Sequence, residues 1–457
     1  MTTIQYSRAG RRQARRGIRP RRSPAVPLLV LAWSGAVAVL SLWWRNTPAV
    51  PATRADWLVH AGRISGLLAG YGIALVVVQM ARVPALERRV GSDRVARWHA
   101  MTGRYALSLT VAHVGLIVYG YALQEGSPLV PYTVTLVTGF PAMAEATAGT
   151  LLLFLVGFVS VGALRRRLRY ELWYYLHLLT YPAVYLVFWH QLATGSEFAG
   201  DPFATTAWYA LYGAAAALLV WYRVLTPVRL NLRHRMRVDS VVPEVPGVVS
   251  VLIRGRRLHR LHAEAGHFFR WRFLAPGLWW TANPYSLSAP PRPDLMRITV
   301  KAAGGHSAAL AGLRPGTRIW AEGPYGALTA ARRRRGKVLL LAGGAGITPL
   351  RALFETLPGA PGDLTLLYRA RSAAELALRE ELEAIAGERG ARLLYAVNSP
   401  DGRRPVIDAE WLREALPDVA EHDVYLCGPP GLAEEWFSTL REAGVPERRI
   451  HHESFEF

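Results

Sequence analysis

Four histidines in two strongly apolar stretches are the residues of this sequence best suited to chemistry. His99 and His113 lie in WHAMTGRYALSLTVAHVGLIVYGY, and His177 and His190 lie in LWYYLHLLTYPAVYLVFWHQL. The first two are 14 residues apart, which in a helix is roughly 21 Å and close to four full turns. Ionisable side chains within a segment that can cross a bilayer usually mark a site. Because neutral imidazole is a common axial ligand of haem iron, we predict that all four histidines are metal ligands.

Six apolar segments must position these histidines, at residues 26–44, 61–81, 99–122, 148–164, 172–192 and 206–225. The loops after the second, fourth and sixth segments each hold at least four arginines, whereas residues 124–147 and 193–205 hold no lysine or arginine. By the positive-inside rule both termini are cytoplasmic. The pattern predicts an all-α, six-helix haem bundle at 26–227 in the plasma membrane, preceded by a basic cytoplasmic tail at 1–25.

In this topology the third and fifth segments run in the same direction, so the histidines pair by depth. His99 and His177 would hold one haem b near the inner face, and His113 and His190 a second near the outer face. Thirteen residues place His190 about 140° around an ideal helix from His177, and Pro182 between them could kink the helix enough to align the two. The alternative is that the histidines only pack helices or reach the interface.

Composition limits the other chemistry open to the chain. A single cysteine, Cys427, excludes an internal disulfide, a cysteine-ligated zinc site and a plant-type iron–sulfur cluster. The net charge of +21 would suit nucleic acid or anionic lipid. Because the arginines cluster beside the apolar segments, we attribute the charge to membrane topology and predict no nucleic-acid partner. Arg63 and Arg104, deep in two segments, either hold haem propionates or reach out to the interface.

The second half of the chain changes to soluble patterns. Short alternating runs predict an antiparallel β-barrel at 228–332, which contains NPYSLS (283–288) and GGHSAAL (304–310). From residue 333 a β/α rhythm predicts a nucleotide-binding α/β domain that extends to 457. There an apolar strand, the turn Gly344-x-Gly346-x-x-Pro349 and a helix follow one another, as in a site that cradles a dinucleotide pyrophosphate.

Together these motifs resemble the ferric reductase and NADPH oxidase superfamily, in particular its bacterial single-chain members, over residues 26–457. The resemblance implies that Tyr285 packs on the isoalloxazine of FAD, that Ser286 approaches its reactive nitrogen, and that the terminal Phe457 covers it until nicotinamide enters. Asn283 replaces the family's histidine or arginine. The resemblance implies catalytic roles for Ser286, Cys427 and Phe457, and leaves the family's catalytic glutamate open between Glu453 and Glu456. The other residues that it implies in cofactor binding are Pro284, Leu287, Ser288, Arg297, Thr299, Val300, Lys301, Gly304, His306 and Ser307 for FAD, and Gly343, Gly344, Gly346, Ile347, Thr348, Pro349, Cys427, Gly428 and Pro429 for NAD(P).

The activity implied by this resemblance is transfer of electrons from cytoplasmic NAD(P)H through FAD and two haems to an acceptor outside the membrane. A ferric chelate is the expected acceptor; oxygen, giving superoxide, and delivery to a quinone or protein partner are the alternatives. Arg369 and Arg371 follow the second strand of the nucleotide domain, where they could pair with the 2′-phosphate of NADPH. The sequence therefore favours NADPH over NADH.

Overall fold

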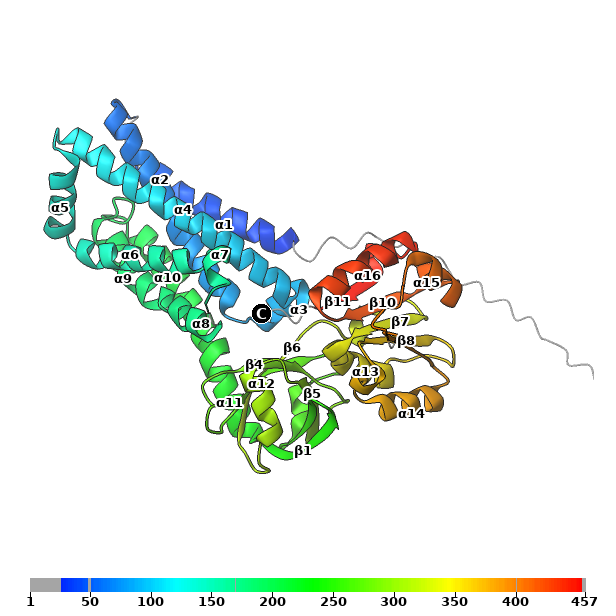
Figure 1. Ribbon diagram of the computed structural model, residues 1–457. Coiled ribbons are helices and arrows are strands. Elements are labelled where there is room, and N and C mark those ends of the chain that lie inside the picture. The colour runs from blue at the N-terminus through cyan, green and yellow to red at the C-terminus, as the bar shows by residue number, and fades with distance from the viewer. Residues whose placement is uncertain (1–25, 48–50, 169, 400, 454–457) are drawn as a thin grey trace, which may run out of the picture.

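A computed structural model describes residues 26–47, 51–168, 170–399 and 401–453 of the chain. A bundle of long helices lies beside a two-lobed body of strands and shorter helices, and α11 (Thr226–His234) leads from one to the other (Figure 1). The predicted basic tail at 1–25 and the terminal Phe457 lie outside the described residues.

Among the described residues, four helices of the bundle are long and apolar enough to cross a membrane: α1 (Val26–Arg45), α2 (Arg54–Met80), α4 (Ser92–Gln124) and the continuous run from Pro202 to His234. That run consists of α10 (Pro202–Val220), the π-helix η1 (Trp221–Leu225) and α11. The shorter helices are α3 (Pro84–Val90), α5 (Leu129–Gly139), α6 (Met143–Val159), α7 (Gly162–Arg165), α8 (Tyr170–Leu178) and α9 (Thr180–Thr194).

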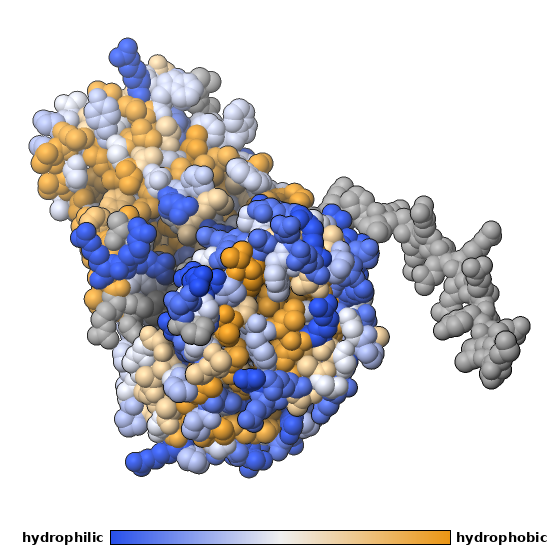
Figure 2. Space-filling model, turned by 45° about the vertical axis from the view of Figure 1, so that its right-hand side comes forward, coloured by the Kyte–Doolittle hydropathy of each residue, from blue (hydrophilic) through white to orange (hydrophobic). Residues whose placement is uncertain are grey.

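The surface of the bundle is apolar, as a lipid environment requires. Leu31, Leu151 and Phe158 are 69%, 63% and 67% exposed. Hydrophobic residues gather over the bundle in the space-filling view (Figure 2). A capping box between Thr53 and Asp56 fixes the start of α2, because each side chain bonds the other residue's backbone N–H.

The fourth and fifth predicted segments differ from straight spans. Residues 129–139 form α5, although 124–147 was predicted as a loop; the prediction overlooked an apolar run, LVPYTVTLVTG, that can form three helical turns. The axes of α5 and α6 meet at 112°, and the two helices count as a fifth candidate span only if they are taken together. The number of six spans therefore stays a prediction.

The fifth predicted segment is broken at Leu179, between α8 and α9. The cause is Pro182, which lacks a backbone N–H and whose ring clashes with the carbonyl four residues earlier, that of Leu178. The break falls between His177 and His190. On an ideal helix these two side chains would point about 140° apart, so a departure from ideal geometry was expected between them.

The first lobe contains two three-stranded antiparallel sheets, ordered β1-β2-β5 and β4-β3-β6. Its strands are β1 (Arg237–Val245), β2 (Val248–Arg254), β3 (Phe268–Phe273), β4 (Asn283–Ser286), β5 (Leu295–Lys301) and β6 (Ile319–Tyr325). Isolated bridges between Leu287 and Ile298 and between Arg237 and Arg318 connect the two sheets at both sides. This lobe keeps the name barrel from the prediction, and the second lobe is the nucleotide domain. Along β3 the side chains of Phe269, Trp271 and Phe273 are buried in the core, and the arginines between them alternate to the other face.

The second lobe is a five-stranded parallel sheet in the order β11-β10-β7-β8-β9. Its strands are β7 (Val338–Gly343), β8 (Leu364–Ala370), β9 (Arg392–Val397), β10 (Asp423–Cys427) and β11 (Ile450–His452), and its helices are α13 (Ile347–Thr356), α14 (Arg379–Arg389), α15 (Ala409–Ala415) and α16 (Pro430–Glu442). Every residue of β7 is buried, as expected of a strand covered by helices on both faces. The strand order reverses between β7 and β10, which is where such sheets bind ligands.

Candidate functional site: two histidine pairs and a reductase module

The four histidines form two pairs between α4 and the broken α8–α9 segment. The ring centres of His99 and His177 are 5.9 Å apart, and those of His113 and His190 are 6.3 Å apart. Two imidazoles that bind one metal from opposite sides at about 2.0–2.1 Å have ring centres roughly 6.3 Å apart. The pairing by depth predicted from the sequence is therefore the pairing in the fold.

Hydrogen bonds from the surrounding helices orient three of the four rings through Nδ1. Nδ1 of His113 lies 2.8 Å from the Gly62 carbonyl oxygen, and Nδ1 of His99 lies 3.4 Å from that of Val76. Nδ1 of His177 is 3.2 Å from Ser160 Oγ. An imidazole held through one nitrogen offers the other to a metal, which is the usual arrangement of a ligating histidine.

Close approach of α2 to α4 makes this orientation possible. A Cβ added at Gly66 would lie 2.5 Å from Nδ1 of His113, so the ring occupies the space that glycine leaves open. Among the described residues no three His, Cys, Asp or Glu side chains gather to hold a metal ion. Each pair offers two imidazole nitrogens, and this donor set would suit a metal held in a planar ring such as haem.

The pair formed by His99 and His177 lies next to the barrel. The hydroxyl of Tyr175, two residues before His177, donates a hydrogen bond to the Trp280 carbonyl at 3.0 Å. Trp280 precedes β4 by three residues. The structure therefore brings α8, which carries His177, beside the segment that leads into the predicted flavin motif.

Residues NPYS of the predicted flavin motif form a strand, β4, which pairs with β3. Tyr285 is half-buried, and burial raises the pKa of its hydroxyl to about 12, so the ring is neutral at physiological pH. Trp271 Nε1 donates to the Tyr285 carbonyl at 3.0 Å and fixes this part of the strand. Ser286 is buried beside it. An aromatic ring held at a strand surface suits stacking on a planar heterocycle.

Several other residues predicted to contact FAD make hydrogen bonds within the protein. Ser288 Oγ accepts hydrogen bonds from Thr299 Oγ1 at 2.7 Å and from Arg297 Nε at 3.2 Å. The sequence GGHSAAL contains α12 (Gly305–Ala309), and Ser307 Oγ accepts from the backbone N–H groups of Ala303 and Gly304. The Ser307 side chain therefore caps the turn. Val300, Pro284 and Leu287 belong to or adjoin the strands, and His306 lies within α12.

The glycine turn of the nucleotide domain adopts the predicted strand–turn–helix form, with a short 3-10 turn at Gly344–Gly346 between β7 and α13. A Cβ at Gly346 would lie 2.0 Å from the carbonyl oxygen of Cys427, and one at Gly343 would lie 2.5 Å from Leu432 Cδ2. Gly344 has φ +53°, which favours glycine, and faces open space. The turn thus packs directly on the end of β10 and leaves an open cradle for a pyrophosphate.

Remaining residues of this crevice lie around the turn. Thr348 Oγ1 donates to the Ala345 carbonyl at 3.0 Å, and Ile347 and Pro349 are buried in the first turn of α13. Gly428 and Pro429 follow β10, and Pro429 lies 3.2 Å from the position of a Cβ on Gly343. The two strand ends that the sequence singled out therefore meet at one edge of the sheet.

Cys427 is fully buried, and burial raises the pKa of its thiol, so the thiol is protonated at neutral pH. Its Sγ donates to the Glu453 carbonyl at 3.8 Å. A Cβ on Gly326, at the end of β6, would lie 3.1 Å from Glu453 Oε1. Of the two candidate glutamates, Glu453 thus lies where the barrel meets the nucleotide domain, whereas Glu456 is outside the described residues.

The two arginines predicted at the coenzyme phosphate have different environments. Arg369 is 8% exposed and donates to the Pro405 carbonyl at 3.3 Å. The side chain of Arg371 is 76% exposed, and its Nε lies 3.1 Å from Glu375 Oε1. Of the two, Arg371 is the one whose guanidinium is accessible to a ligand.

Sequence reasoning missed the ion pairs that join the two lobes. Glu381 on α14 accepts two hydrogen bonds from Arg297, at 2.6 and 2.8 Å, and lies 2.8 Å from Arg351. Glu375 accepts from Lys301 at 3.0 Å. Burial tends to raise the pKa of Glu381, but the two arginines outweigh it and hold the pKa below its usual value. Arg297 and Lys301, predicted to contact FAD, also fasten the nucleotide domain to the barrel.

The fold and the site together define a membrane-anchored oxidoreductase with a flavin and nicotinamide-nucleotide module. Comparisons with known proteins give the family. Residues 65–188 match the model of the ferric reductase like transmembrane component, and residues 340–436 match that of the oxidoreductase NAD-binding domain. The chain belongs to the oxidoreductases that join a ferric reductase-like membrane domain to an FAD/NAD reductase module of the ferredoxin reductase type.

Two of the similar proteins are reductases or reductase subunits by name. Ferredoxin–NADP reductase B of Sorangium cellulosum is 35% identical over 192 residues, which cover 38% of this chain and 77% of that protein. The reductase subunit of stachydrine N-demethylase from Rhizobium meliloti is 32% identical over 232 residues, covering 47% of this chain and 64% of the relative. The cytochrome P450 reductase GcoB from Amycolatopsis, a solved structure, shows 24% identity and a TM-score of 0.41, covering 49% of this chain and 69% of that one. The chain spans about half the length of two flavohemoprotein relatives from Xylella fastidiosa.

Proposed function

We propose that this protein carries electrons from cytoplasmic NAD(P)H across the membrane to a ferric chelate on the other side. The observation that supports it most is the stacking of two histidine pairs along α4, with one pair beside the flavin strand. A single pair would suit a local electron-transfer centre, whereas two pairs at different depths provide a path through the bundle. FAD supplies conversion between two-electron and one-electron transfer, and haem supplies single-electron carriage, when they are bound.

The chain's own residues position these groups. His99 and His177 would hold the inner haem, and His113 and His190 the outer one. Tyr285 would stack on the isoalloxazine while Ser286 approaches its reactive nitrogen. The glycine turn at 344–346 would receive the coenzyme pyrophosphate, and the buried Cys427 would shape the crevice as a neutral thiol. Phe457 is proposed to cover the flavin when no nicotinamide is present.

NADPH is the proposed coenzyme. Arg371 lies just after β8, where the adenosine ribose of a bound dinucleotide is expected, and its guanidinium is accessible. A phosphate there would compete with Glu375 for Arg371. An NAD-specific site usually places a carboxylate that can bond the ribose hydroxyls, so the balance between Arg371 and Glu375 decides the preference.

The test uses the full chain in proteoliposomes with ferric citrate enclosed and NADPH supplied on the reductase side. His113→Ala should lower the pyridine haemochrome yield from two haems per chain to one. It should also leave reduction of the flavin by NADPH intact and abolish reduction of the enclosed iron. His60→Ala is the matched control, because His60 lies in α2 near the same end of the bundle and contacts Trp43 rather than another histidine.

Two outcomes would count against the proposal. If His113→Ala reduced the enclosed ferric citrate at the rate of the unaltered protein, the outer pair would not lie on the path. If the unaltered protein reduced oxygen or a quinone efficiently but not ferric citrate, the acceptor would be wrong although the path would stand.

A further inference from the structure

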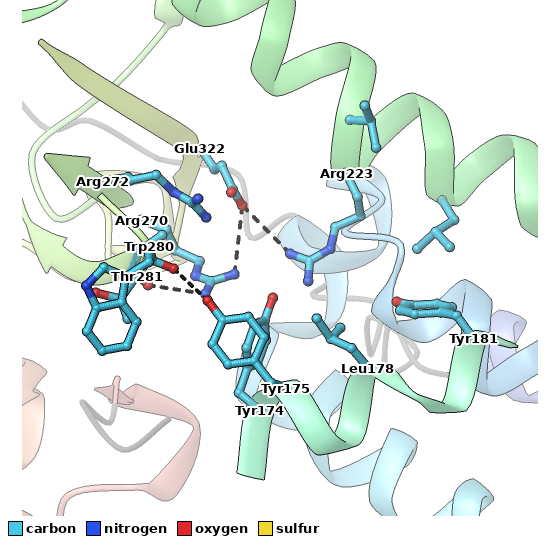
Figure 3. Close-up of a pocket in the computed structure, with 13 residues that line it drawn as sticks. Tyr174, Tyr175, Leu178, Tyr181, Arg223, Arg270, Arg272, Trp280, Thr281 and Glu322 are labelled. Atoms are coloured by element: carbon cyan, nitrogen blue, oxygen red, sulfur yellow. Dashed lines mark hydrogen bonds and ion pairs between the residues drawn. The ribbon is translucent and has the colours of Figure 1, made fainter. Parts of the chain in front are cut away.

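A cavity of about 300 Å³ lies between the helix bundle and the barrel, and neither the histidine pairs nor the coenzyme crevice includes it. One wall comes from α8, α9, α10 and η1, and the other from β3, β6 and the loop before β4. Figure 3 shows Arg223 reaching in from the helix side and Arg270, Arg272 and Glu322 from the strand side, with Tyr174 and Tyr175 beside them. Residues far apart in the sequence thus meet around one polar space.

The charges around the cavity do not balance. Glu322 lies 3.7 Å from Arg223 and 3.8 Å from Arg270, so one carboxylate is shared loosely between two guanidinium groups. Arg272 also lines the cavity, donates weakly to the Trp279 carbonyl at 3.4 Å, and has no carboxylate within 4.0 Å among the described residues. Two positive charges therefore remain without a counter-charge. An anion in the cavity would neutralise them through charge-assisted hydrogen bonds.

A further polar group in the wall lacks a partner. The hydroxyl oxygen of Thr281 is buried and makes no hydrogen bond with any described residue. Buried polar atoms are nearly always satisfied, so an unsatisfied one in a cavity wall indicates a group that the structure does not include. Arg223 lies in the π-helix η1, a distortion frequently found at functional sites.

The helix side of the cavity also carries apolar residues next to exposed hydrophobic surface of the bundle. Leu178, Leu219 and Val224 line it, and Val224 and the adjacent Leu225 are 51% and 41% exposed. A small soluble anion would leave these apolar side chains uncovered, whereas the acyl chains of a lipid would cover them. Basic pockets beside transmembrane helices on the cytoplasmic side are known to receive anionic lipid headgroups.

We propose that this cavity binds the phosphate headgroup of an anionic phospholipid, with Arg272 and Arg270 on the phosphate and the acyl chains along Leu178 and Val224. The lipid would fill the joint between the bundle and the barrel. This proposal needs the bundle to be embedded in a membrane, and it is independent of which acceptor receives the electrons.

The test places the full chain in nanodiscs of phosphatidylcholine with or without phosphatidylglycerol, extracts it into detergent, and counts retained phosphatidylglycerol by native mass spectrometry. Arg272→Gln should lower the affinity for phosphatidylglycerol about tenfold or more, since a charge-assisted contact is lost. Arg233→Gln is the control, because Arg233 is exposed on α11 outside the cavity and should leave retention unchanged. Arg272→Lys keeps the charge and should restore part of the affinity, which separates loss of binding from misfolding.

Three results would overturn the proposal. Equal retention by Arg272→Gln and the unaltered protein would show that the cavity does not select the headgroup. Displacement of phosphatidylglycerol by sn-glycerol 3-phosphate or inorganic phosphate at comparable affinity would show that the ligand is a soluble phosphate. Loss of FAD from Arg272→Gln in parallel with phosphatidylglycerol would show that the cavity belongs to the flavin site.

Discussion

Replacing Gly346 with alanine tests whether the contact between the glycine turn and β10 shapes the coenzyme crevice. The added Cβ would lie 2.0 Å from the Cys427 carbonyl oxygen and 2.4 Å from its carbon. Ordinary contact begins near 3.4 Å, so the turn and the end of β10 must separate by about 1.4 Å. Both partners are backbone, and a side-chain rotation cannot relieve the clash.

Two consequences of this separation can be estimated. Overpacking of this kind costs about 1–3 kcal/mol, which should lower the Tm of the nucleotide domain by several degrees. A displacement of about 1 Å in groups that position a substrate can cost roughly a hundredfold in rate, so kcat/KM for NADPH should fall by about that factor. The assay is the initial rate of flavin reduction by NADPH in stopped flow, together with a thermal melt.

Gly387→Ala provides the matched control. Gly387 lies within α14, and a Cβ there would meet nothing within 4 Å. Alanine should stabilise the helix by roughly 0.5–1 kcal/mol and leave flavin reduction unchanged. The reasoning would be refuted if Gly346→Ala kept both its Tm and its kcat/KM for NADPH, because the two strand ends would then not be held in contact.

Three further outcomes are expected. Gly66→Ala should lower haem content relative to Gly115→Ala, because the first Cβ would lie 2.5 Å from Nδ1 of His113 and the second would meet nothing within 4 Å; equal haemochrome yields would contradict this. Glu375→Gln should lower the KM for NADPH but not for NADH, since Arg371 would lose its carboxylate partner; unchanged coenzyme selectivity would argue against a phosphate at Arg371. Lys301 donates to Glu375 and holds the pKa of this carboxyl below its usual 4.5. Because this carboxyl has its lower pKa in the folded state, its stabilisation is present above about pH 4.5 and is lost as the pH falls through the folded value. Thermal melts from pH 7 to pH 3 should show a steeper loss for the unaltered protein than for Glu375→Gln.

The histidine pairing could be predicted because it depends on a few strong constraints. Charge in the loops sets the direction of each segment, and direction sets which histidines share a depth. The 13-residue spacing of His177 and His190 also indicated a distortion of the helix near Pro182, and the structure has a break there. By contrast, α5 was overlooked because a short apolar run between spans gives a weak signal and no charge pattern marks it.

The ion pairs between the two lobes could not be predicted from the sequence, for a different reason. Glu375 ends a short 3-10 turn and Glu381 lies in the first turn of α14, where acidic residues are ordinary, and nothing local indicates that Lys301 and Arg297 will face them. Only a weak sequence pattern indicated where the cavity arginines lie, because alternation along β3 places Arg270 and Arg272 on the outward face. What covers an outward face depends on tertiary packing, which a single sequence does not reveal.

The barrel is attached to the bundle at three separate places, and this limits how the two can move. Arg82, in the turn after α2, lies 5.2 Å from the Tyr325 ring centre, Tyr175 of α8 bonds Trp280, and Arg223 of η1 pairs with Glu322. A body pinned at one point can swivel and one pinned at two can hinge, but three points leave it no free rotation unless they lie on one line. The nucleotide domain is fastened to the barrel at several places as well, by the Arg297–Glu381 and Lys301–Glu375 ion pairs and by the packing of Val248 against Ala377 and Leu378. Contacts that are separate in the chain thus set the spacing between β4 and the His99–His177 pair, and this spacing can stay constant while coenzyme enters and leaves the crevice at the far edge of the parallel sheet.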